Sequence, residues 1–135
     1  MNQTDSKFQP LNLLVGSVLV IVGVVIMTKV RLDLKRKAGF SNLTSTKIVQ
    51  VVDGHQLITD GLFSQIRHPL YLGFLLMLFG ITIIFASLLG AVLIAISVVF
   101  ILIRIRIEEE MLTQTFGEAY REYQGNTKKL IPYIY

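Results

Sequence analysis

The fold is decided by residues 70–103, LYLGFLLMLFGITIIFASLLGAVLIAISVVFILI, which contain no charged side chain over 34 positions. One helix of this length would reach about 51 Å, well beyond a bilayer hydrocarbon core of about 30 Å. Two helices joined by a tight turn fit better, and we place the turn near Ser87-Leu-Leu-Gly90. The run therefore predicts a membrane hairpin with helices over residues 70–87 and 89–106.

The composition of the whole chain also favours a membrane. The 135 residues are 53% hydrophobic and 16% charged, against roughly 25% charged residues in soluble domains. A first apolar run, residues 11–28, is long enough to span a bilayer. We therefore expect a single-domain, all-α integral membrane protein with about three transmembrane helices.

The flanking charges predict how these helices are oriented. The first apolar run is followed at once by a basic segment that only Asp33 opposes, namely Lys29, Arg31, Lys35, Arg36 and Lys37. Basic segments stay in the cytoplasm, so the N-terminus is expected outside and both hairpin ends inside. Residues 29–67 then form a cytosolic loop, and residues 107–135 a cytosolic amphipathic helix and tail. Within the loop, residues 47–59 predict either a β-hairpin or a short interfacial helix.

Several kinds of chemistry are disfavoured by residue counts. The chain has no cysteine, so disulfides and thiolate sites are excluded. Its two histidines, His55 and His68, lack the spacing of metal ligands, and no metal site is expected. The net charge of +4 forms no basic stripe interleaved with aromatic residues, which speaks against nucleic-acid binding.

Two polar clusters bracket the hairpin, and polar groups at such positions usually mark a site. One is Arg67-His68-Pro69-x-Tyr71-x-Gly73, and the other begins with Arg104 and ends with Glu108-Glu109-Glu110. Pro69 suits the first turn of a helix, which places His68 near its N-cap, where an anion is favoured. Arg104 and Glu108, at i and i+4, form either a surface ion pair or part of a cation site. With Tyr71 and Phe63 as aromatic faces, the set is compatible with S-adenosylmethionine.

These residues lie in an ordered set of motifs. The set comprises Ala38-Gly39, Val49-Gln50, His55-Gln-Leu-Ile-Thr59-x-Gly61, the Arg67 motif, Arg104-x-x-x-Glu108-Glu109, Phe116-Gly117-x-x-Tyr120-x-x-Tyr123 and Leu130-Ile-Pro132. In order and spacing the chain resembles the isoprenylcysteine carboxyl methyltransferases and the related phospholipid methyltransferases, over residues 38 to 133. The resemblance implies an all-α membrane enzyme that transfers a methyl group from S-adenosylmethionine to the carboxylate of a prenylated cysteine at the cytosolic face.

The resemblance also implies roles for individual residues. Arg104 would bind the substrate carboxylate and act in catalysis. The cofactor would be bound by Gln50, His55, Gln56, Leu57, Ile58, Phe63, His68, Pro69, Leu70, Tyr71 and Glu108. The expected partners are a lipophilic or prenylated acceptor and membrane lipids, and the sequence does not predict an oligomeric state. Phe63 stands where the family usually has Tyr, and relatives often carry more helices before the motifs.

Two alternatives remain open at this point. Membrane sterol-type reductases, which bind a nicotinamide cofactor such as NADPH, carry a similar Arg-His-x-x-Tyr element, typically with Asn at the position of Leu70. Leu70 and the Glu108-Glu109 pair favour the methyltransferase. The other alternative is a small membrane protein without enzymatic activity, against which the polar clusters at both hairpin ends argue.

Overall fold

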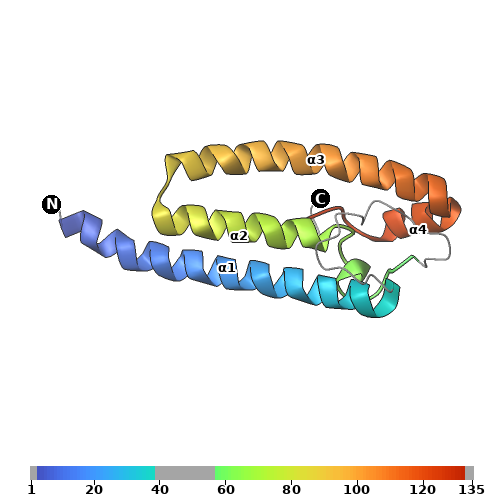
Figure 1. Cartoon of the computed structure of the whole chain (residues 1–135), viewed down its shortest axis with the longest axis horizontal. Coiled ribbons are helices and arrows are strands. Elements are labelled where there is room, and N and C mark those ends of the chain that lie inside the picture. The colour runs from blue at the N-terminus through green and yellow to red at the C-terminus, as the bar shows by residue number, and fades with distance from the viewer. Residues whose placement is uncertain (1–2, 39–56, 133–135) are drawn as a thin grey trace.

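The protein is a layer of helices. The computed structural model describes residues 3–38 and 57–132, in which every regular element is helical. The elements are α1 (Gln3–Ala38), η2 (Gly61–Ser64), α2 (Pro69–Phe85), α3 (Leu88–Phe116) and α4 (Glu118–Asn126). Helices α1, α2 and α3 lie side by side with α2 in the middle, and α4 sits where α1 ends and α2 begins (Figure 1). The predicted all-α fold is confirmed.

The long helices expose the apolar surface that a bilayer requires. Pro10–Arg36 of α1 and Leu88–Phe116 of α3 are long and apolar enough to cross a membrane. Helix α2 is apolar but has only 17 residues, which at 1.5 Å per residue gives about 26 Å. Phe85 and Leu88, at the hairpin tip, are 75% and 83% exposed. Continuous apolar faces of this size are unfavourable in contact with water, so the protein is an integral membrane protein.

Helices α1 and α2 approach each other through glycines. A Cβ atom added to Gly23 would lie 2.5 Å from the Gly73 carbonyl oxygen, and one added to Gly73 would lie 2.8 Å from the Gly23 oxygen. Gly16 and Gly80 approach each other in the same way two helical turns away. Small residues at a membrane-helix interface permit this backbone contact. The four glycines therefore set the short distance between α1 and α2.

The hairpin turn is tighter and earlier than predicted. Ala86 adopts a left-handed conformation with φ of 44°, which ends α2. Ser87 then caps α3, because its side chain accepts a 3.1 Å hydrogen bond from the Gly90 N–H. Residues 88–90, predicted to lie in the turn, are already helical. The difference arises because a serine N-cap starts a helix directly after it.

Two predicted boundaries are wrong for the same reason. Helix α1 continues through the basic segment to Ala38, so residues 29–38 are helix and not loop. Helix α3 continues ten residues past 106, so the C-terminal helix does not begin at 107. Lysine, arginine, glutamate and leucine are good helix formers, and neither stretch contains a breaker before Gly39 or Gly117. Gly117, with φ of 56°, separates α3 from α4, a break the sequence analysis did not anticipate.

The polar end of the layer is tied together by a small core. Leu75 of α2, Ile101 and Ile105 of α3, and Leu130 of the C-terminal segment form a buried cluster. Of the segment predicted as hairpin or interfacial helix, residues 57–59 are described and are neither strand nor helix. The rest of that segment lies outside the described residues. Helix α4 ends at Asn126.

Candidate active site

The segment before α2 is held by the C-terminal segment. The Arg67 N–H donates to the Lys128 carbonyl at 2.8 Å, and the His68 N–H donates to the Lys129 carbonyl at 3.0 Å. The Lys128 N–H returns a 3.0 Å bond to Gln65, which makes a short parallel pairing. The residue that precedes α2 is thus positioned by residues some sixty places further along the chain.

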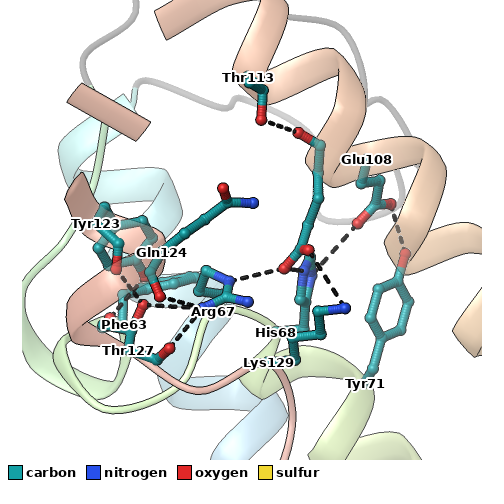
Figure 2. A network of polar contacts seen from close by, with 11 residues as sticks. Phe63, Arg67, His68, Tyr71, Glu108, Thr113, Tyr123, Gln124, Thr127 and Lys129 are labelled. Carbon is teal, nitrogen blue, oxygen red and sulfur yellow. Dashed lines mark hydrogen bonds and ion pairs between the residues drawn. The ribbon is translucent and has the colours of Figure 1, made fainter. Parts of the chain in front are cut away.

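His68 occupies the position that the sequence predicts. It is the N-cap of α2, with Pro69 in the first turn, and it is only 7% exposed. Its ring lies against α3, with Nδ1 3.6 Å from Glu108 Oε2 and Nε2 3.3 Å from Glu109 Oε1. Figure 2 shows the imidazole directed toward Glu108. The ring also stacks on Tyr71, with centroids 5.9 Å apart.

Tyr71, Arg104 and Glu108 form a connected group across the hairpin. The Tyr71 hydroxyl donates a 2.5 Å hydrogen bond to Glu108 Oε1. Arg104 Nε donates to the Tyr71 hydroxyl at 2.8 Å and lies 3.1 Å from the same Glu108 oxygen. Glu108 is 4% exposed, whereas the Arg104 side chain is 35% exposed. The i,i+4 pair therefore exists, but it joins a buried carboxylate to a half-buried cation and is not a surface ion pair.

A second buried group adjoins the first and was not assigned from sequence. Arg67 Nε donates a 2.7 Å hydrogen bond to Glu109 Oε1, with both side chains at most 10% exposed. Arg67 Nη1 also donates to the carbonyls of Gln124 and Thr127, at 3.1 and 2.5 Å. Lys129 Nζ lies 3.8 Å from Glu109 Oε2. The sequence offered one indication of this pair: Arg67 directly precedes His68, and Glu109 directly follows Glu108, in the two motifs.

A cavity of about 60 Å³ opens beside these groups. Its lining consists of Val30, Leu34, Phe63, Arg67, His68, Pro69, Leu70, Tyr71 and Glu108. Six residues predicted to bind the cofactor are therefore brought together here. Helix α1 adds two apolar residues that sequence reasoning missed. Arg104 does not line the cavity, but it contacts two residues that do.

The remaining predicted residues divide into two groups. Leu57 and Ile58 are half-buried and do not line this cavity. Gln50, His55 and Gln56 lie outside the described residues. Within residues 3–38 and 57–132 no cluster of side chains has the composition of a metal site.

Phe63 is anchored from α4. The Tyr123 hydroxyl donates a 2.6 Å hydrogen bond to the Phe63 carbonyl, and burial raises the pKa of Tyr123 to about 12. Tyr120, on the same helix, is 1% exposed, and burial raises the pKa of its phenol as well. The Tyr120 hydroxyl has no hydrogen-bond partner among the described residues. Helix α4 thus contributes two buried, neutral phenols next to the cavity, one of which binds the cavity residue Phe63.

Comparison with known proteins assigns the family. The sequence profile of the phospholipid methyltransferases matches residues 11–119. The chain belongs to the phospholipid methyltransferase family. This confirms the resemblance drawn from the ordered motifs and favours it over the reductase alternative.

Members of the family and its relatives align with most of this chain. Protein-S-isoprenylcysteine O-methyltransferase A of Arabidopsis thaliana is 31% identical over 120 residues, 88% of this chain and 58% of the relative. Methanethiol S-methyltransferase of Pseudomonas deceptionensis is 35% identical over 91 residues, 67% of this chain and 33% of the relative. The structure of the eukaryotic intramembrane Ras methyltransferase ICMT matches with a TM-score of 0.75 and 30% identity, over 90% of this chain and 42% of that one. The chain thus spans less than two thirds of each of these relatives.

Proposed function

We propose that the protein is a membrane methyltransferase that transfers the methyl group of S-adenosylmethionine to the carboxylate of a lipophilic acceptor. The acceptor class we favour is an S-prenylated cysteine, which relatives of this chain are named for. The observation that carries the proposal is the group of buried His68, half-buried Tyr71 and buried Glu108 beside Arg104, at the polar end of an apolar helix layer.

The charges of the cavity suit the amino-acid part of this cofactor. A carboxylate has about four lone-pair positions, and Glu108 Oε1 already accepts from Tyr71 and Arg104. Glu108 Oε2 lies 3.6 Å from His68 and retains capacity for an ammonium group. The first turn of α2 begins at Pro69 and offers backbone N–H groups to a carboxylate. The remainder of the cofactor site would be formed by Gln50, His55, Gln56, Leu57 and Ile58.

The cofactor, when bound, supplies a methyl group activated by its sulfonium. The acceptor carboxylate is already ionised at neutral pH, so the protein need not remove a proton from it. The task of the protein is then to orient the nucleophile and to keep water away. Arg104 would do this by binding the carboxylate through its planar guanidinium. Its Nε is held by Tyr71 and Glu108, so the group is oriented before the acceptor arrives.

The proposed orientation places the site in the cytosol. Basic residues are concentrated at the end of α1 that lies beside the site (Figure 1), and Arg104 and Arg106 lie in the second half of α3. The positive-inside rule assigns this end to the cytoplasm and the N-terminus to the opposite side. A prenyl chain would reach Arg104 along the apolar outer faces of the hairpin. This explains why such an enzyme is embedded in a membrane.

Cofactor binding is the first test. Detergent-solubilised protein is titrated with S-adenosylmethionine by calorimetry, beside Glu108→Gln and Glu110→Gln. Both variants remove one charge from the same triplet, but Glu110 is exposed and Glu108 is buried. We expect binding by wild type and Glu110→Gln, and at least a tenfold loss in Glu108→Gln, about the value of one charge-assisted hydrogen bond. Folded wild type that binds NADPH, or neither compound, contradicts the proposal.

Methyl transfer is the second test. A small S-prenyl cysteine with a free carboxylate is compared with the same compound as a carboxamide and with a short-chain thiol. We expect transfer to the carboxylate alone. Transfer to the thiol would instead assign the chemistry for which the Pseudomonas relative is named. Because a short-chain thiol is protonated at neutral pH, that reaction would also require a base.

A further inference from the structure

Glu109 is a buried carboxylate beside the candidate site. Three side chains surround its carboxylate: Arg67 at 2.7 Å, the His68 ring at 3.3 Å and Lys129 at 3.8 Å. It is 8% exposed and does not line the cavity. A buried carboxylate is costly unless its environment compensates the charge. The carboxylate of Glu109 is therefore fixed by its buried contacts, whereas that of its neighbour Glu110 is exposed.

Arg67 fixes the position of this carboxylate from the other side. Its guanidinium spans from Glu109 Oε1 to the carbonyls of Gln124 and Thr127, which lie at the end of α4. A planar guanidinium held at both edges has little freedom to rotate. The location of Glu109 Oε1 is consequently set by where the C-terminal segment crosses the start of α2. Figure 2 shows Arg67 beside Gln124 and Thr127.

The same oxygen faces the imidazole of the site. Glu109 Oε1 accepts from Arg67 and lies 3.3 Å from His68 Nε2, while His68 Nδ1 points toward Glu108. A carboxylate beside one ring nitrogen of a histidine determines which nitrogen carries the proton and how the ring is turned. The backbone N–H of His68 donates to the Lys129 carbonyl. The C-terminal segment therefore positions the backbone of His68 directly and its ring through Arg67 and Glu109.

We propose that Glu109 and Arg67 are positioning residues, through which the C-terminal segment Thr127–Leu130 sets the orientation of the His68 ring in the site. The proposal rests on the proposed function for its consequence, which is tighter cofactor binding. Neither residue is expected to touch the reacting atoms. Glu109 acts on the cofactor site through His68. Arg67 also lines the cavity, and its proposed effect on the His68 ring is through Glu109.

The orientation of His68 can be measured without any cofactor. The chain contains only two histidines, so ¹⁵N-histidine labelling gives two sets of ring resonances, assigned by the loss of one set in His68→Gln. Spectra of Glu109→Gln are compared with those of Glu110→Gln as the matched control. We expect the His68 ring nitrogens to shift in Glu109→Gln and to remain at wild-type positions in Glu110→Gln. Wild-type His68 resonances in folded Glu109→Gln would overturn the proposal.

Cofactor titration of the same variants supplies the functional arm. Loss of an outer partner of a ligand-binding histidine costs about 10- to 100-fold in metal sites, and we expect about a tenfold weaker Kd for S-adenosylmethionine in Glu109→Gln. If wild type does not bind, the proposed function fails, while the NMR result still decides the role of Glu109. If wild type and Glu109→Gln bind equally well, the positioning role is wrong.

A second variant covers the case in which Glu109→Gln does not fold. Arg67→Lys keeps a positive charge beside Glu109 but replaces the planar fork with a single ammonium group. It cannot hold Glu109 and both C-terminal carbonyls in the present geometry. We expect shifted His68 resonances and a weaker Kd in this variant too. Wild-type spectra and affinity in Arg67→Lys would likewise overturn the proposal.

Discussion

The Tyr71 hydroxyl lies 2.5 Å from Glu108 Oε1, and this contact joins the first turn of α2 to α3 across 37 residues of sequence. Arg104 Nε donates to the same hydroxyl at 2.8 Å. One phenol thus links the carboxylate proposed for the cofactor to the guanidinium proposed for the acceptor. Hydrogen bonds to charged groups contribute about 1.5–3 kcal/mol each, so this phenol is a sensitive point of the site.

Tyr71→Phe tests that link. The ring and its contact with His68 remain, while the hydroxyl that orients Arg104 is lost. We expect kcat/KM for methyl transfer to fall about tenfold to a hundredfold, the equivalent of one such hydrogen bond. Thermal unfolding in detergent measures stability in parallel, to separate this effect from loss of fold. Unchanged kinetics would show that the hydroxyl does not orient Arg104.

Arg104→Lys separates acceptor binding from cofactor binding. The lysine retains the charge but cannot bind a carboxylate at two points or keep the Nε contacts. We expect KM for the acceptor to rise about tenfold while the Kd for S-adenosylmethionine stays within about twofold. Arg106→Lys is the control, because Arg106 lies two residues further on the same helix and is exposed. Equal effects in both variants would remove the assignment of Arg104.

Gly73→Ala tests the contact between α1 and α2. The new methyl group would lie 2.8 Å from the Gly23 carbonyl oxygen, and overpacking of this kind costs about 1–3 kcal/mol. Gly125→Ala is the matched control, since no atom lies within 4 Å of its added Cβ. Thermal unfolding in detergent should show a lower midpoint for Gly73→Ala alone. Equal midpoints would mean that the helices separate without cost.

The two buried phenols of α4 should respond in opposite directions to loss of the hydroxyl. Tyr120→Phe removes a buried hydroxyl that has no partner among the described residues, and we expect stability to rise by about 1 kcal/mol. Tyr123→Phe removes the bond to the Phe63 carbonyl, and we expect a loss of about 1 kcal/mol. Denaturant titration measures both. A loss in Tyr120→Phe would show that its hydroxyl has a bonding partner.

Tyr123 also makes the stability of the protein depend on pH in the alkaline range. Burial raises the pKa of Tyr123 from its ordinary value near 10 to about 12, so folding favours the neutral form. This contribution is complete below pH 10 and is lost as the pH rises toward 12. Unfolding midpoints across pH 9 to 12 should fall less steeply in Tyr123→Phe. Identical slopes would contradict the buried, neutral state of Tyr123.

Sequence reasoning found the parts of the molecule that depend on local patterns. The uncharged run from Leu70 to Ile103 predicted the hairpin, and Pro69 predicted the start of α2 and the place of His68. Boundaries were less accurate, because nothing in hydropathy reports that a basic or acidic segment continues a helix. The continuation of α1 past Thr28 and of α3 past Arg106 follows from helix propensity, which a search for apolar runs ignores.

Contacts between distant segments were the part that the sequence did not reveal. Arg67 and Glu109 appear in the quoted motifs, yet no pattern states that they pair or that Thr127 joins them. These contacts depend on the break at Gly117, which turns the chain back toward α2. A single sequence carries the residue types of this group but not their three-dimensional adjacency.

The pairing of residues 65–68 with residues 127–129 has a consequence for biosynthesis. The apolar helices α1, α2 and α3 precede these last residues in the chain, so they can form before the last residues are translated. His68 and Glu109 gain their final partners only after Lys129 has left the exit tunnel. A chain halted after Phe116 would therefore contain the three long helices but lack the contacts that Arg67, His68 and Glu109 make with the C-terminal segment.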